Sequence, residues 1–364
     1  MRLADLATPA LLVDVERLER NLTRMAGAFA GTGVALRPHV KTSKCWAVVC
    51  RQLDAGAIGI TCSTPAEVVW LQRQGVADLL WAHLPIGPSK VELAVDSAWR
   101  GGLTVTLDSV AAARPLADAA HRAGLTVPYL LEVNTGHARL GVDPARAVCA
   151  AAAIAALPGL RLRGVLTHEG HLAASPDRPS LEAAGATAGA LLVQVAEALR
   201  DAGYEMDIVS VGSTPGATSA PFAPGITEAR PGTYAYYDAN QTRLGSCTID
   251  DCALTVLARV VSVQRDGRPI IDAGVKAMSS DTIATAGSLG LVVDLTGAPV
   301  DGVRFAEGNE EHGFLLDAGT PRLRVGELVR LVPNHACGTT NMWSNVYAVH
   351  GDEVVDSWPI SARY

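Results

Sequence analysis

Short apolar runs alternate with helix-like segments from residue 34 to about residue 230. Each run ends at polar residues or at Gly and Pro, which is the pattern of buried strands in a parallel sheet. The segments between the runs carry helical signals: residues 110–123, for example, follow a capping residue at Asp108 or Ser109 and precede Gly124. This βα rhythm predicts eight strands, at 34–39, 57–62, 78–83, 102–107, 127–133, 162–168, 206–212 and 227–230.

The number of strands indicates an α/β fold with a (β/α)8 barrel of the TIM type, since eight strands and their helices fit into roughly 200 residues. An open doubly wound sheet is the alternative. The barrel is favoured because side chains capable of chemistry stand at the carboxyl end of each run, where barrel enzymes carry their sites. These side chains and backbone positions are Lys41, Thr61, His83, Asp108, Asn134, His168, Ser213 and Gly232.

The two ends of the chain follow other patterns. Apolar residues recur at helical spacing over 18–29, and the β-like stretch 10–14 before them is a candidate strand of a second domain. After residue 245, alternating Val/Leu/Arg-rich stretches such as 254–263 predict a β domain. We therefore expect a barrel domain over 1–245, with its first strand a candidate for the other domain, and a β-rich domain over 246–364.

Composition narrows the class of protein. Hydrophobic residues make up 49% and charged residues 18% of the 364 residues, so the chain can bury a core. A net charge of -7 without a Lys/Arg-rich run argues against nucleic-acid or membrane binding and favours a small-molecule partner. No apolar stretch approaches the ~20 residues of a membrane span, and no signal-peptide pattern is seen, so we expect a cytoplasmic protein. Seven scattered cysteines predict reduced thiols.

Two features suggest a phosphorylated aldehyde cofactor. Lys41 closes the first predicted strand, and an amine desolvated in a barrel mouth can form a Schiff base, although a single Lys is usually a solvated surface residue. Small and hydroxyl residues follow the seventh and eighth strands, at 210–216 and 230–234. Barrels often bind phosphate at this position, because small residues let backbone N–H groups approach the oxygens, but tight turns alone have the same composition.

The chain resembles the fold-type III pyridoxal-phosphate (PLP) enzymes, and within them the D-threonine aldolase/D-serine dehydratase family, over essentially its whole length. Six segments in the same order carry the resemblance, at 8–10, 38–42, 134–141, 212–215, 230–234 and 333–337. It implies an alanine racemase-like N-terminal barrel in which Lys41 binds pyridoxal 5'-phosphate. By the same resemblance Arg139 contacts the phenolic oxygen of the cofactor, Thr214, Gly232 and Thr233 hold its phosphate, and the neighbouring cofactor-binding residues are His168, Ser213 and Tyr234.

A second group of predicted ligands stands near the C-terminus. His335 and Cys337 lie two apart at a predicted strand end, so their side chains should leave the same face and reach one ion. Two ligands are too few for a structural zinc site, but a catalytic ion needs open positions; a thiolate with an imidazole favours Zn²⁺, with Mn²⁺ as the alternative. The residues alone fit a core pair as well, and the resemblance favours the metal.

Several residues of the family segments depart from the usual pattern or have open roles. Family members often carry Tyr-x-His-x-Gly-His-x-Tyr after the sixth strand, and here Leu166 and Ala173 occupy the tyrosine positions. His168 and His171 remain, either as an acid/base and a cofactor neighbour or as hydrogen-bonded rim residues. His312 lies in a segment that resembles one near the family's metal, and it is a further candidate site residue.

The resemblance implies a PLP- and metal-dependent lyase that acts on D-3-hydroxy amino acids, and a homodimer. D-threonine aldolases typically carry Asp where Cys337 stands, whereas D-serine dehydratase-like members carry His-x-Cys, so the expected reaction is dehydration to a 2-oxo acid and ammonia. Retro-aldol cleavage to glycine and an aldehyde is the alternative. An amino-acid racemase is disfavoured because no Gly-Tyr-x-Asp-Gly-like segment is present, and a non-catalytic PLP carrier because such carriers are usually a barrel alone.

Overall fold

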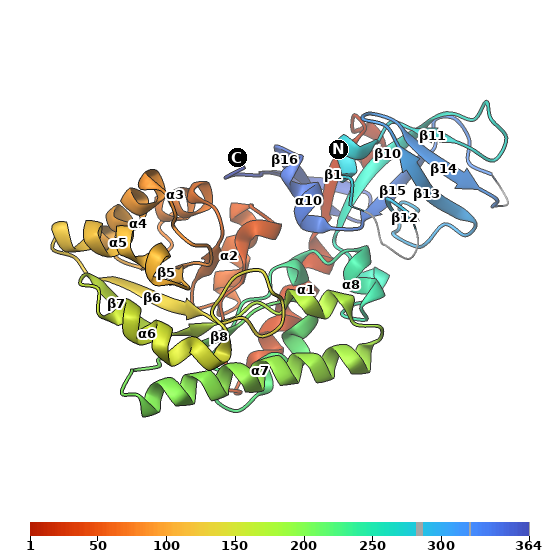
Figure 1. Ribbon diagram of the computed structural model, residues 1–364. Helices are drawn as coiled ribbons and strands as arrows, with labels where there is room; N and C mark the ends of the chain where they lie inside the picture. Colours follow the sequence, from red (N-terminus) through yellow and green to blue (C-terminus); the bar gives the residue numbers. More distant parts are fainter. Residues whose placement is uncertain (282–286, 320–321, 364) are drawn as a thin grey trace. The chain divides into compact units, whose positions relative to one another are not determined.

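The structure, a computed structural model, describes residues 1–281, 287–319 and 322–363 (Figure 1). The chain forms two compact units. The barrel unit comprises Ala26–Lys41 and Gln52–Gly232, and the β unit comprises Met1–Met25, Thr42–Arg51 and Thr233–Arg363. The chain therefore passes from one unit to the other directly after Met25, Lys41, Arg51 and Gly232.

Eight parallel strands form the barrel unit, in the order β2-β9-β8-β7-β6-β5-β4-β3. A bridge between His39 and Thr61 joins β2 to β3, so the pairing continues around all eight strands. The predicted barrel is confirmed, and the open sheet is excluded. The strands are β2 (Ala35–Leu36), β3 (Ile60–Cys62), β4 (Leu79–Trp81), β5 (Leu103–Leu107), β6 (Val127–Glu132), β7 (Leu160–Leu166), β8 (Ile208–Val211) and β9 (Glu228–Ala229).

Helices follow the strands, as the sequence pattern predicts. The helix expected over 110–123 is α5, which begins where Ser109 Oγ accepts the Ala112 N–H at 3.3 Å. It ends before Gly124, which adopts a φ of 67°. The longer helices are α1 (Val15–Phe29), α2 (Trp46–Asp54), α3 (Pro65–Arg73), α4 (Pro88–Arg100), α5 (Val110–Arg122), α6 (Ala147–Ala155) and α7 (Arg178–Asp201).

Burial explains why the strands read as uninterrupted apolar runs. All five residues of β5 are buried, because helices cover one face of a parallel barrel sheet and the barrel interior covers the other. The strands stop where polar residues begin, so the carboxyl ends of the strands carry the predicted site residues.

The β unit contains a nine-stranded sheet in the order β11-β14-β13-β12-β15-β10-β1-β16-β17, and β10 also pairs with β11. Because of this extra pairing, the strands β10, β11, β14, β13, β12 and β15 form a closed antiparallel barrel. β1 pairs with β10 and β16, so the first strand of the chain belongs to this sheet. The strands are β1 (Ala10–Asp14), β10 (Leu254–Ser262), β11 (Ile270–Ile271), β12 (Gly290–Val293), β13 (Val303–Gly308), β14 (Gly313–Asp317), β15 (Leu328–Pro333), β16 (Asn345–His350) and β17 (Glu353–Pro359).

In the described part of the β unit, the short helices α8 (Ala239–Arg243), α9 (Val275–Met278) and α10 (Ala336–Asn341) stand between strands. Across the described residues, no helix combines the length and the apolar character that crossing a membrane requires.

Candidate active site

Lys41 stands on a 3-10 turn, Val40–Thr42, just beyond the end of β2. His39 holds this turn, because its Nδ1 accepts the Lys41 N–H at 3.3 Å. The other ring nitrogen, Nε2, therefore carries the proton and donates to Ser63 Oγ at 3.0 Å. The neutral His39 fixes the backbone from which the half-buried Lys41 side chain extends.

Asn134 organises the loop that follows β6. Its side-chain oxygen accepts the N–H groups of Gly136 and Ala138, both at 3.0 Å, as in turns that Asn closes on its own backbone. Ala138 adopts a φ of 54°, which this pair of hydrogen bonds supports. The loop presents His137 and the exposed Arg139.

The loops after β6 and β7 interlock. A Cβ on Gly136 would lie 3.1 Å from the ring of His171, and one on Gly170 would lie 2.5 Å from the ring of His137. The His137 ring also stands edge-on to His168, with the ring centroids 5.6 Å apart. The two glycines thus allow three histidines to pack closely at one place on the barrel rim.

The histidines after β7 are uncharged at neutral pH. Burial, with smaller contributions from Lys41 and Arg139, lowers the pKa of His168 well below its usual value. Its Nδ1–H therefore donates to the Gly212 carbonyl oxygen, and Nε2 has no proton. Burial also lowers the pKa of His171, whose Nδ1 is buried with no hydrogen-bond partner among the described residues. Both rings can accept a hydrogen bond or a proton.

Arg230, which follows β9, is a buried cation at the centre of the rim. It donates to Ser210 Oγ and, at 2.6 Å, to the Thr167 carbonyl oxygen. Burial lowers the pKa of Arg230, whereas the carboxylates of Glu228 and Glu169 act in the opposite direction. The sequence interpretation quoted Arg230 within a motif but missed it as a site residue, because its partners come from other strands.

The predicted phosphate segments are tightly packed small residues. Ser213 Oγ accepts the Gly216 N–H at 3.0 Å. A Cβ on Gly216 would lie 2.8 Å from that oxygen, and one on Gly212 would lie 2.9 Å from the Arg230 side chain. Only glycine fits at these two positions. The set of a lysine amine, hydroxyl groups and bare backbone suits an aldehyde that carries a phosphate, so the residues present fit PLP.

The predicted metal pair lies in the β unit, and one step of the sequence reasoning was wrong. His335 has an extended backbone, with φ of -139°, but Cys337 lies in the first turn of α10, not in a strand. The chain turns into a helix here because buried Asp238 accepts the Ala336 N–H at 2.9 Å. The two side chains nevertheless meet: hydrogen bonding to Cys337 raises the pKa of His335 to about 9, against the effect of burial.

Neighbouring residues orient this pair. His335 Nδ1–H donates to Asp281 Oδ2 at 2.9 Å, which leaves Nε2 for a ligand, the arrangement usual for metal-binding histidines. Thr42 Oγ1 lies 3.1 Å from Cys337 Sγ, and Thr233 Oγ1 lies 4.0 Å from it. An imidazole, a thiolate and a supporting carboxylate are a donor set that fits Zn²⁺.

No group of three or more His, Cys, Asp or Glu side chains in the described ranges could hold a metal ion, so the pair provides two ligands.

The remaining predicted residues lie as follows. His312 is exposed in the hairpin turn between β13 and β14, where its carbonyl oxygen accepts the Asn309 N–H at 2.9 Å. Its role stays a prediction. Tyr234 and Thr214 are buried, and Thr233 is half-buried.

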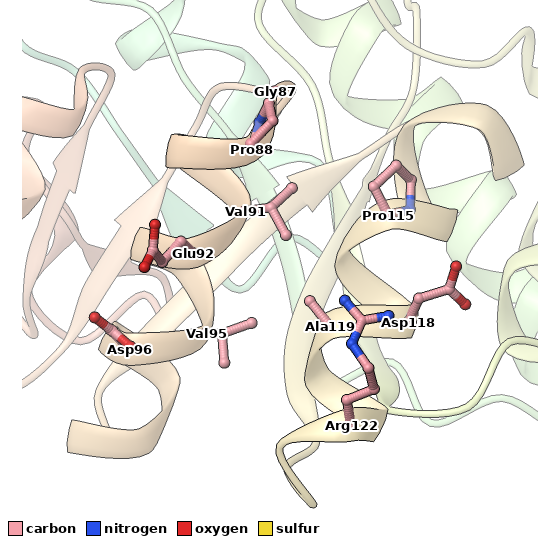
Figure 2. Close-up of a pocket in the computed structure, with 10 residues that line it drawn as sticks. All are labelled: Gly87, Pro88, Val91, Glu92, Val95, Asp96, Pro115, Asp118, Ala119 and Arg122. Carbon is pink, nitrogen blue, oxygen red and sulfur yellow. The ribbon is translucent and has the colours of Figure 1, made fainter.

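Concave sites occur at the rim and elsewhere on the barrel unit. Small cavities at the strand ends are lined by residues of the rim, including Arg139 and His168 in one and Ser213 and Arg230 in another. A larger groove of about 620 Å³ lies between α4 and α5, where Val91 and Val95 face Pro115 and Ala119 (Figure 2). This groove contains none of the predicted site residues.

Comparison with known proteins matches both parts of the chain. The model of the alanine racemase N-terminal domain matches residues 13–240, and one described as "Putative serine dehydratase domain" matches residues 253–349. D-threo-3-hydroxyaspartate dehydratase of Delftia sp. (strain HT23) is 38% identical over 98% of this chain and 97% of its own length. D-threonine aldolase of Arthrobacter sp is 31% identical over 99% of this chain and 94% of its own length.

A solved structure agrees along the whole chain. A cysteine-to-alanine variant of D-threo-3-hydroxyaspartate dehydratase, in the metal-free form, superposes with a TM-score of 0.93 and 36% identity, covering 100% of this chain and 99% of that one. Because this form is described as metal-free, the relative can be expected to have a metal-bound form as well. The chain belongs to the fold-type III PLP enzymes, in the family that contains the D-threonine aldolases and D-serine dehydratases.

Proposed function

We propose that this protein is a PLP- and metal-dependent lyase of D-3-hydroxy amino acids, and within that class a dehydratase that produces a 2-oxo acid and ammonia. The observation that carries the proposal is the His335–Cys337 pair with Asp281 behind the imidazole. The named activities of the relatives, dehydration and aldol cleavage of D-3-hydroxy amino acids, support the substrate class.

The barrel residues would hold the cofactor. Lys41 would bind PLP and move the α-proton of the substrate, and Arg139 would contact the phenolic oxygen. Bound PLP supplies an electron sink for the bond that breaks at Cα. Hydroxyl and backbone groups would hold its phosphate, namely Ser213, Thr214, Gly232, Thr233 and Tyr234.

The rim histidines would act as uncharged groups. His168 and His171 have pKa values lowered by burial, so each enters the reaction uncharged, and such a ring acts first as a proton acceptor and as an acid only after it has taken up a proton. We propose His171, with its unpaired Nδ1, as the acid/base and His168 as the neighbour of the cofactor. His312 remains a candidate without a defined contact.

The pair of metal ligands would act on the β-hydroxyl of the substrate. His335 Nε2 and Cys337 Sγ would hold the ion and leave open positions on it, and the chemistry such an ion would supply is that of a Lewis acid for the departure of hydroxide. Lys41 directly precedes Thr42, whose hydroxyl lies 3.1 Å from Cys337 Sγ.

The retro-aldol reaction is the second candidate, because a D-threonine aldolase is 31% identical to the chain. The two reactions differ in their products. Purified protein loaded with PLP and Zn²⁺ would be incubated with D-serine, D-threonine and D-threo-3-hydroxyaspartate, and 2-oxo acid plus ammonia would be measured against glycine plus aldehyde. We expect the 2-oxo acid, and glycine as the main product would contradict the dehydratase.

Removal of the metal tests the other half of the proposal. EDTA-treated protein should keep its PLP and its yellow colour but lose turnover, and Zn²⁺ should restore it. Activity that survives both EDTA and Cys337→Ala would contradict the metal assignment. We also propose a homodimer, which light scattering of the purified protein would measure.

A further inference from the structure

Two cysteines of the β unit lie together at a place that the proposed reaction does not use. Cys247 and Cys252 flank a single 3-10 turn, Ile249–Asp251. Thr248 caps this turn, since its N–H donates to Asp251 Oδ2 at 2.8 Å, and the Cys252 N–H donates to the Ile249 carbonyl oxygen at 3.1 Å. The turn folds the chain back on itself, so the residues at its two ends are neighbours.

The sulfur atoms share a partner and contact each other. Thr242 Oγ1 lies 3.5 Å from Cys247 Sγ and 3.6 Å from Cys252 Sγ. Side-chain hydrogen bonding between Cys252 and Cys247, together with burial, raises the pKa of Cys252, and the Cys252 Sγ also lies 3.9 Å from the Thr248 carbonyl oxygen. Because one hydroxyl reaches both sulfurs, the two thiol groups lie close together, which is the first requirement for a disulfide.

The two thiols differ in access to solvent. Cys252 is 0% exposed, whereas Cys247 is partly exposed. A small oxidant in solution therefore reaches Cys247 first and leaves Cys252 as the adjacent thiol that can resolve the product. This division between an accessible and a resolving cysteine is typical of redox-sensitive thiol pairs.

We propose that Cys247 and Cys252 are a peroxide-sensitive dithiol that closes to an intramolecular disulfide. The Cys247 thiolate attacks one oxygen of hydrogen peroxide, which breaks the O–O bond and gives a sulfenic acid and hydroxide. Cys252 then attacks the sulfenic sulfur, loses its proton and displaces the second oxygen as water. In total, two thiols lose two electrons and two protons, and hydrogen peroxide is reduced to two molecules of water.

The position of the pair connects it with the predicted metal segment. Thr242 lies on α8, and its hydroxyl also donates to the Asp238 carbonyl oxygen at 3.2 Å. Asp238 caps α8 and accepts the N–H of Ala336, the residue between His335 and Cys337. Disulfide formation would remove the two thiol groups that Thr242 contacts. Thr242 lies one helical turn from Asp238, whose carboxylate accepts the Ala336 N–H.

The experiment uses full-length protein loaded with PLP and Zn²⁺. It is treated with increasing hydrogen peroxide, denatured in N-ethylmaleimide, digested with trypsin and analysed by mass spectrometry. Arg243 and Arg259 bracket one tryptic peptide that contains both cysteines. We expect this peptide to become two hydrogen atoms lighter and to take up no label, and dithiothreitol treatment before alkylation to restore both labels.

Matched variants separate the pair from general thiol oxidation. In Cys149→Ser, which removes an exposed thiol of α6, the disulfide should form as in the unmodified protein. In Cys247→Ser, Cys252 should stay available for labelling at peroxide concentrations that close the natural pair. The proposal is overturned if the natural peptide keeps both labels while Cys149 is oxidised, if Cys247 stops at a sulfinic acid with Cys252 labelled, or if either cysteine is linked to a different peptide.

Discussion

Asp281 offers a direct test of the proposed metal site, because its carboxylate contacts the proposed ligand His335 and is not itself a proposed ligand. His335 Nδ1–H donates to Asp281 Oδ2 at 2.9 Å. In Asp281→Asn the amide replaces a charged acceptor with a neutral one, so the imidazole becomes a weaker donor to the metal and loses its fixed orientation. Removing such a partner typically lowers metal affinity about 10- to 100-fold, or about 1.4–2.7 kcal/mol.

The assay is competition for Zn²⁺ between the PLP-loaded protein and a chromophoric chelator. Asp266→Asn is the matched control, because Asp266 is an exposed carboxylate of the β unit that pairs with Arg322. Both variants should unfold at nearly the same temperature as the natural protein, since the Asp266 side chain is 92% exposed and that of Asp281 is 49% exposed, and exposed pairs contribute little. Equal Zn²⁺ affinities of Asp281→Asn and Asp266→Asn would refute the role of His335 as a ligand supported by Asp281.

Three further predictions concern the barrel rim. Borohydride reduction should fix PLP covalently on Lys41, and Lys41→Ala should lose the adduct; a label on another lysine in peptide mapping would contradict the assignment. In Gly170→Ala the new Cβ would meet the His137 ring at 2.5 Å, so PLP affinity and turnover should fall while thermal unfolding changes little, whereas Gly27→Ala, where nothing lies within 4 Å, should bind PLP normally. Because His168 is neutral in the folded state, only the unfolded chain binds a proton at this residue as the pH falls below 6.5. The free energy of unfolding should therefore decrease by about 1 kcal/mol between pH 6.5 and 5.5 on account of this residue. Urea unfolding of His168→Gln should lack that part of the decrease.

Most strands were predictable because the barrel buries both of their faces, although β7 begins with partly exposed residues. A strand such as β5 has no solvent face, so the sequence carries a continuous apolar run whose ends mark the strand. Right-handed βα connections place successive strands next to one another in the sheet. The residues that follow the carboxyl ends of these strands therefore lie at the same end of the barrel. The strand β1 was harder to assign, because its partners β10 and β16 lie more than 200 residues away in the sequence.

The local geometry at the site was less predictable, because it depends on contacts between distant residues. The pattern around His335 suggested a strand, and the helix α10 begins there instead because Asp238 supplies a hydrogen-bond acceptor from almost 100 residues earlier. Arg230 was passed over for a similar reason. Glu228 stands two residues before it, but Glu169 follows another strand, and no spacing in the sequence indicates that this second carboxylate and the acceptors of its hydrogen bonds lie beside it.

The electrostatics of the rim explain why a dehydratase built on this barrel would need a metal. Expelling a β-hydroxyl requires an acid or a cation, because hydroxide is a poor leaving group. Burial lowers the pKa of both His168 and His171, so neither imidazole holds a proton to give at neutral pH. The uncharged rings have a lone pair that can accept a proton, as a retro-aldol reaction needs, but the same burial makes them weaker bases than a solvated imidazole. In the proposed reaction the departure of hydroxide would therefore depend on the ion that His335 and Cys337 would hold, and the balance between the two lyase reactions would depend on whether its Lewis acidity favours loss of the hydroxyl group or of the hydroxyl proton.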